Sequence, residues 1–117
     1  MHKFQDLSVY QKSLDFTVVA REVCSGFPKD ELYVLSAQFK RAADSISLNI
    51  SEGAGDSSDK EFVRFLGYSI RSAFECIGCS DIALRNKYID QEKHSELCNA
   101  CNELIAMLYS LQKHYRG

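Results

Sequence analysis

Two cysteine pairs are the residues of this chain whose spacing most resembles a site of chemistry. Cys76 and Cys79 form one CxxC pair, and Cys98 and Cys101 form a second. The interval between the pairs falls inside the range found in zinc ribbons. Four thiolates at such spacing hold a tetrahedral zinc ion. Taken alone, the spacing predicts a structural zinc site.

The context of these pairs favours free thiols instead. Zinc CxxC pairs sit on tight turns, whereas both pairs here lie within predicted helices. At roughly 100° per residue, Cys76 and Cys101 point into the core of their helices. Cys79 and Cys98 lie on flanks that face opposite sides, because the two predicted helices run in opposite directions. We therefore expect buried free cysteines and no bound metal. A structural zinc-binding bundle is the minor alternative.

Other signatures of catalysis or of cofactor binding are missing from the sequence. The stretch SEGAGDSSDK lacks the Gly-Lys-Ser/Thr ending of a phosphate-binding loop. Glu52, Glu61 and Glu75 lie on inward-facing helices, but the Glu-x-x-His pairs of a di-iron bundle are not present. The histidines form no HExxH motif, and they are His2, His94 and His114. We expect no enzyme activity and no cofactor.

Composition indicates one globular domain that spans residues 1–117. Apolar residues make up 45% of the chain and charged residues 26%, which is ordinary for a globular protein. A single proline, Pro28, and six glycines leave room for long helices. The net charge of −2 differs from the strongly basic character of nucleic-acid modules. With no apolar run of signal-peptide or membrane-spanning type, we expect a cytoplasmic protein.

Apolar periodicity predicts helices over about 7–25, 31–53, 58–87 and 91–115. Short connections make neighbouring helices antiparallel, so we expect an all-α, up-down-up-down four-helix bundle. Gly26 is expected to end the first helix in a left-handed conformation, and Gly53 with Gly55 to end the second. The predicted N-terminal caps are, in chain order, Asp6 or Ser8, Asp30, Ser58 in a capping box with Glu61, and Asp90.

The second helix carries a polar stripe beside its apolar face. Its members recur at steps of three and four, and they are Gln38, Arg41, Ser45, Asn49 and Glu52. Small neighbours such as Ala42 and Ala43 let an adjacent backbone approach, which would partly bury these groups. Folding the second and third helices together brings Arg41 one turn from Glu75. We hypothesise that Glu75 offsets Arg41 and that Gln38 completes a structural polar network. The alternative is a solvated face.

The run FPKDELYVLSAQFKRAADSISLNISEG resembles the four-helix-bundle family of 23S ribosomal RNA intervening sequences. The opening FQDLSVYQKSLDF also resembles the start of that family, with Tyr10 where tryptophan is common. The resemblance implies an antiparallel bundle, a homopentamer and no known enzyme activity. Relatives include accessory proteins of diversity-generating retroelements, which are basic pentamers that engage nucleic acid and a reverse transcriptase. The matching positions are Gln38, Arg41, Ala42, Ser45, Ile46, Asn49, Ile50, Glu52 and Gly53.

We expect the protein to associate with itself and to have no membrane partner. Two hypotheses for a further partner follow. In the first, the oligomer binds RNA, DNA or a nucleic-acid-processing protein through basic side chains. The candidate contacts are Lys40, Lys60, Arg64, Arg71 and Arg85. In the second, the protein is an adaptor for another protein, with no nucleic-acid role. The wide apolar arc of the third helix fits both, whereas the net charge of −2 favours the second.

Overall fold

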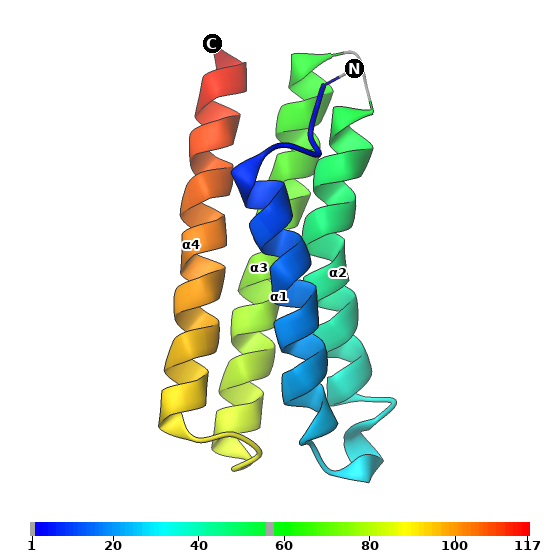
Figure 1. Cartoon of the computed structure of the whole chain (residues 1–117), viewed down its shortest axis with the longest axis vertical. Coiled ribbons are helices and arrows are strands. Elements are labelled where there is room, and N and C mark those ends of the chain that lie inside the picture. The colour runs from blue at the N-terminus through cyan, green and yellow to red at the C-terminus, as the bar shows by residue number, and fades with distance from the viewer. Residues whose placement is uncertain (1, 56–57) are drawn as a thin grey trace.

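The computed structural model describes residues 2–55 and 58–117. Within these ranges the chain forms α1 (Ser8–Ser25), a short 3-10 helix η1 (Lys29–Glu31), α2 (Leu35–Ala54), α3 (Asp59–Arg85) and α4 (Gln91–Arg116), with no strand. The helices lie side by side in a bundle that measures 44 × 24 × 20 Å (Figure 1). Both termini lie at one end, and the α1–α2 and α3–α4 turns lie at the other (Figure 1). The all-α four-helix bundle expected from the sequence is confirmed.

Two of the four predicted helix caps are confirmed. The Ser58 hydroxyl accepts a hydrogen bond from the Glu61 backbone N–H at 3.0 Å, at the start of α3. The Asp90 carboxylate accepts one from the Lys93 N–H at 2.8 Å, at the start of α4. Each bond satisfies a backbone donor that the first helical turn leaves free.

The predicted start of α2 is wrong by four residues. The fixed φ of Pro28, −56°, leads into the 3-10 turn η1 rather than into a continuous helix. The Val34 backbone, at φ −119° and ψ −95°, then breaks the helical path. Asp30 therefore does not cap α2, and the Glu31 carboxylate accepts from the Leu35 N–H at 3.4 Å instead.

The first helix has the predicted bounds to within one residue, but the residues that flank it differ from the prediction. Leu7 is the N-cap residue of α1 and makes no side-chain cap, so neither Asp6 nor Ser8 serves in that role. Gly26 has φ −90° and ψ −5°, which is the right-handed region, so the predicted left-handed stop is wrong. Positive φ occurs elsewhere in the described residues, at Lys87 with φ 65° in the α3–α4 turn and at Gly117 with φ 79°.

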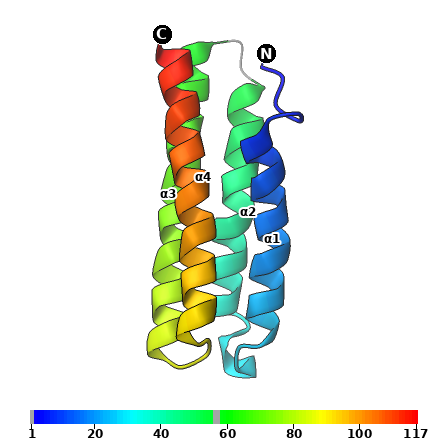
Figure 2. The same ribbon diagram turned by 60° about the vertical axis from the view of Figure 1, so that its left-hand side comes forward.

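The core is organised around α3, which packs closely against both α2 and α4. Helix α1 lies mainly on α2 and touches α4 far less, and its backbone does not approach that of α3 closely. Figure 2 shows the resulting arrangement, with α3 beside α4 and α1 beside α2. Buried Ala42, Ala43 and Ala73 let the backbones of α2 and α3 approach. Among the described residues, no helix has the length and apolar character needed to cross a membrane.

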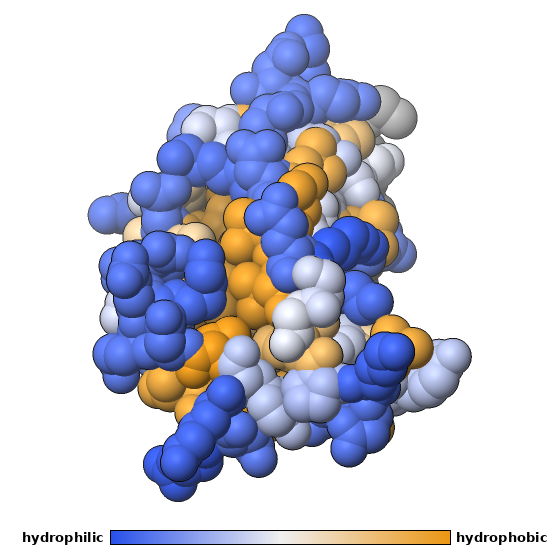
Figure 3. Space-filling view, turned by 60° about the horizontal axis from the view of Figure 1, so that its bottom comes forward, coloured by the Kyte–Doolittle hydropathy of each residue, from blue (hydrophilic) through white to orange (hydrophobic). Residues whose placement is uncertain are grey.

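The seam between α1 and α4 stays open along its length. Three hollows follow it, with volumes of about 440, 190 and 310 Å³ from the end that carries the termini to the turn end. Apolar side chains line each of them, including Met107, Phe16 and Val23 in that order. An apolar strip is visible between polar side chains where α1 and α4 meet (Figure 3). A 2.7 Å ion pair between Lys12 and Glu103 bridges the middle of the seam.

At Gly53, the backbone of α2 approaches the side chains of α3 closely. A Cβ at this position would lie 2.5 Å from the Cβ of Phe65 and 3.2 Å from Cδ1 of Phe62. Both neighbours belong to α3, and Phe62 is fully buried. The α2–α3 packing therefore requires glycine here. This is a different reason from the predicted one, because α2 continues through Gly53 and ends at Ala54.

We expect Gly53→Ala to lower the free energy of unfolding by about 1–3 kcal/mol, because the added methyl group overpacks a rigid contact. Gly78→Ala is the matched control, since a Cβ there meets nothing within 4 Å. Removing glycine from an open position inside α3 should raise stability by about 0.5–1 kcal/mol. Chemical denaturation measures both. Equal effects of the two substitutions would contradict this description of the α2–α3 contact.

Candidate functional site

The polar stripe of α2 lies mostly at the surface. Gln38, Arg41 and Glu52 are exposed, and Ser45 and Asn49 are half-buried. The Asn49 amide donates to the backbone carbonyl of Ser45 at 2.8 Å, within the same helix. The structure therefore differs from the expected partly buried network, because the stripe runs along the rim of the α2–α3 contact.

Only part of the proposed Arg41 network forms. The Gln38 side chain donates to the Glu75 carboxylate at 3.4 Å, which links α2 to α3 as expected. Arg41 makes no ion pair with any described residue, so Glu75 does not offset its charge. The Arg41 side chain is exposed at the surface.

Buried serines, rather than the stripe, join the helices by hydrogen bonds. The Ser13 and Ser47 hydroxyls bond to each other at 2.9 Å between α1 and α2. Ser69 of α3 donates to the Ile46 carbonyl of α2 at 2.9 Å. No buried side-chain nitrogen or oxygen in the described residues lacks a partner. Such a satisfied interior helps to hold the bundle together.

The outer side of α3 carries four exposed basic residues, Lys60, Arg64, Arg71 and Arg85. Arg64 is already engaged, because two of its nitrogens donate to the Glu61 carboxylate at 2.7 Å each. This hydrogen-bonded pairing raises the pKa of Arg64 above its ordinary value. The guanidinium also donates to the Tyr68 hydroxyl at 2.8 Å. Glu61 therefore offsets the charge of Arg64.

The remaining basic side chains are not engaged in this way. Lys60, Arg71 and Arg85 make no ion pair with the described part of the chain. Lys40, on α2, is half-buried and likewise makes none within that part. Of the candidate nucleic-acid contacts, the three on α3 are the ones that the structure leaves exposed and uncompensated.

The two CxxC pairs do not bring four sulfurs to one point. All five cysteines are free, and a hydrogen bond to Cys101 together with burial raises the pKa of the Cys76 thiol. Burial raises the pKa of Cys79 to about 11, so this thiol stays protonated at neutral pH. Cys98 is only half-buried and lies against His94 rather than against Cys79. The geometry is that of buried thiols, not of a zinc ribbon.

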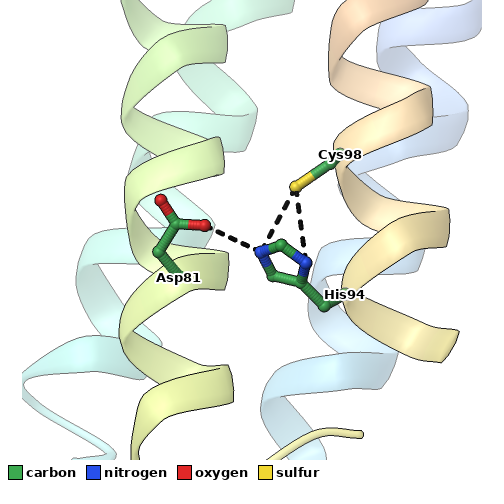
Figure 4. A group of neighbouring side chains, drawn as sticks. All are labelled: Asp81, His94 and Cys98. Carbon is green, nitrogen blue, oxygen red and sulfur yellow. Dashed lines mark hydrogen bonds and ion pairs between the residues drawn. The ribbon is translucent and has the colours of Figure 1, made fainter. Parts of the chain in front are cut away.

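A cluster that sequence reasoning missed lies near the turn end of α3 and α4. It consists of Asp81, His94 and Cys98, whose ligand atoms all lie within 4.8 Å of one another (Figure 4). The sequence contains one signal of this cluster, because His94 and Cys98 are spaced so that they lie one helical turn apart. Asp81 belongs to the other helix, so it becomes a neighbour only after folding.

Comparison with known proteins places the chain in a family. The family model described as the 23S rRNA-intervening sequence protein matches residues 5–110. A crystal structure from Bacteroides thetaiotaomicron, of a protein with unknown function from the S23 ribosomal protein family, superposes with a TM-score of 0.83. It is 27% identical, and the match covers 90% of this chain and 98% of that one. Among curated proteins, no match is found. The chain therefore belongs to the 23S rRNA-intervening sequence protein family.

Proposed function

We propose that this protein is a non-enzymatic, self-assembling scaffold whose antiparallel, up-down-up-down bundles associate into a ring. The resemblance to the family implies a ring of five subunits. The observation that supports self-association is the exposure of large apolar side chains on two separate surfaces of one chain. Such side chains gain free energy when a second protein surface removes them from water.

The first apolar surface lies on α1 and α2. Val18 is 56% exposed and Leu48 61% exposed, and Leu14 lines a shared hollow with Leu48. The second surface lies on α3, where Phe74 is 52% exposed and Ile82 49% exposed. The two surfaces lie on different helices, the first on α1 and α2 and the second on α3. A contact between two unlike surfaces repeats head to tail and closes into a ring when the rotation allows.

Sedimentation velocity tests the ring. We expect the protein to sediment at about five times the mass of the 13.3 kDa chain. Leu48→Glu should shift it to single chains, because a buried unpaired carboxylate is costly in an apolar contact. Tyr109→Glu is the matched control, since Tyr109 is 53% exposed on α4, outside both surfaces. Sedimentation as a single chain at micromolar protein concentration would contradict the proposal. An assembly whose mass is unchanged by Leu48→Glu would contradict it as well.

A second candidate function is nucleic-acid binding by the outer side of α3. This side also carries Phe74 and Ile82, so the candidate is an alternative to the ring contact there. The exposed side chains of Lys60, Arg71 and Arg85 support it, because none of them makes an ion pair within the described residues. Such a surface neutralises phosphates without reading bases. The net charge of −2 per chain disfavours nucleic-acid binding. If nucleic acid does not bind, the alternative is a protein–protein adaptor.

Gel-shift assays at low salt with structured RNA and with duplex DNA test this candidate. We expect binding that weakens as salt rises, and a loss of at least about tenfold when Arg71 and Arg85 are both replaced by alanine. Arg64→Ala is the control, because Glu61 already offsets that charge, and it should weaken binding much less. Failure of both nucleic acids to bind at low salt would eliminate the candidate and leave the adaptor.

A further inference from the structure

We propose that Asp81, His94 and Cys98 form a binding site for a zinc-type transition-metal ion that joins α3 to α4. The proposal is independent of the assembly and nucleic-acid proposals above. It also differs from a CxxC site, because it uses one cysteine of the four in the two pairs and adds an imidazole and a carboxylate.

The three side chains converge from two helices. His94 and Cys98 lie one turn apart on α4, so both project from the same side of that helix. The His94 Nε2 atom lies 3.5 Å from the Cys98 sulfur and 2.7 Å from Oδ1 of Asp81 on α3. Figure 4 shows the imidazole between the carboxylate and the sulfur. A metal ion here would clip the two helices together beside their connecting turn.

These distances are close to those of a tetrahedral zinc site. Zinc lies about 2.0–2.2 Å from nitrogen and oxygen ligands and about 2.3 Å from sulfur, so ligand atoms in a tetrahedron are about 3.3–3.6 Å apart. The nitrogen–sulfur distance of 3.5 Å already meets this requirement. The nitrogen–oxygen distance of 2.7 Å must lengthen by about 0.6 Å. The Asp81 side chain is 63% exposed and is free to make that shift.

A proton relay is the competing interpretation of an aspartate, a histidine and a cysteine. A relay needs the carboxylate on one ring nitrogen and the sulfur on the other. Here the Asp81 oxygen bonds Nε2, and the Cys98 sulfur is nearer to that same atom, at 3.5 Å, than to Nδ1, at 3.9 Å. One nitrogen with two approaching ligand atoms suits a shared cation better than a relay.

The donor set defines the class of ion. Imidazole nitrogen with thiolate sulfur selects zinc or cobalt over magnesium and calcium, which prefer oxygen ligands. Binding releases the thiol proton of Cys98 to solvent, since the thiolate is the ligand. The protein supplies three ligands and the site lies at the surface beside the exposed Asp81. The fourth position therefore belongs to water or to an external ligand.

The same chain contains an internal control for this cluster. His2 Nε2 lies 2.7 Å from Oδ1 of Asp59, which is the same aspartate–histidine distance as in the proposed site. No cysteine joins this pair in a metal-ligating group within the described residues. The proposal therefore predicts a sulfur-ligated metal ion at His94 and not at His2.

Titration of the whole protein with Co²⁺ under a non-thiol reductant tests the site. We expect one ion per chain, a sulfur-to-cobalt charge-transfer band, and displacement by Zn²⁺. Cys98→Ser should abolish that band, and His94→Gln and Asp81→Asn should each weaken binding by at least about tenfold. His2→Gln should leave both the band and the affinity unchanged. Circular dichroism checks that every variant keeps its helices.

Two outcomes would overturn the proposal. The first is the absence of a charge-transfer band in the unaltered protein. The second is a band that survives Cys98→Ser or His94→Gln but disappears in Cys101→Ala, which would move the site to the CxxC pairs. Asp81→Asn keeps the test independent of folding, because Asp81 is exposed and its replacement disturbs no buried contact.

Discussion

The close approach of α2 to α3 at Gly53 is the constraint on which the rest of the bundle depends. A side chain at this position would overlap Phe65 of α3, and buried alanines continue the contact away from it. Ser69 ties the two backbones together through the Ile46 carbonyl. Helix α4 then packs on α3, and α1 packs on α2. Two helices therefore form the central layer, and the outer two are attached to it separately.

This arrangement places the functional potential of the molecule on its surfaces. Every buried side-chain nitrogen or oxygen of the described residues has a partner, and the buried thiols of Cys76 and Cys79 have raised pKa values that keep them protonated. What the bundle offers to other molecules is exposed apolar side chains, uncompensated arginines on α3, and a small group of possible metal ligands at the turn end.

Sequence reasoning succeeded where structure is decided locally. Helical periodicity and the caps at Ser58 and Asp90 depend on neighbours in the chain, and both are present. The start of α2 was missed because Pro28 leads into a 3-10 turn that periodicity does not reveal. The exposure of Arg41 and the meeting of Asp81 with His94 depend on how two helices are rotated against each other. The spacing of apolar residues identifies the buried face of a single helix. It does not show which side of that face the neighbouring helix covers.

Native-state hydrogen exchange tests the central position of the α2–α3 pair most directly. Amides that open only when the whole protein unfolds identify its most stable unit. We predict that buried amides of α2 and α3 exchange only through global unfolding. Those of α1, which leaves its seam with α4 open, should exchange through a smaller opening. Equal protection of α1 and the α2–α3 pair, or earlier opening of α2, would contradict the account.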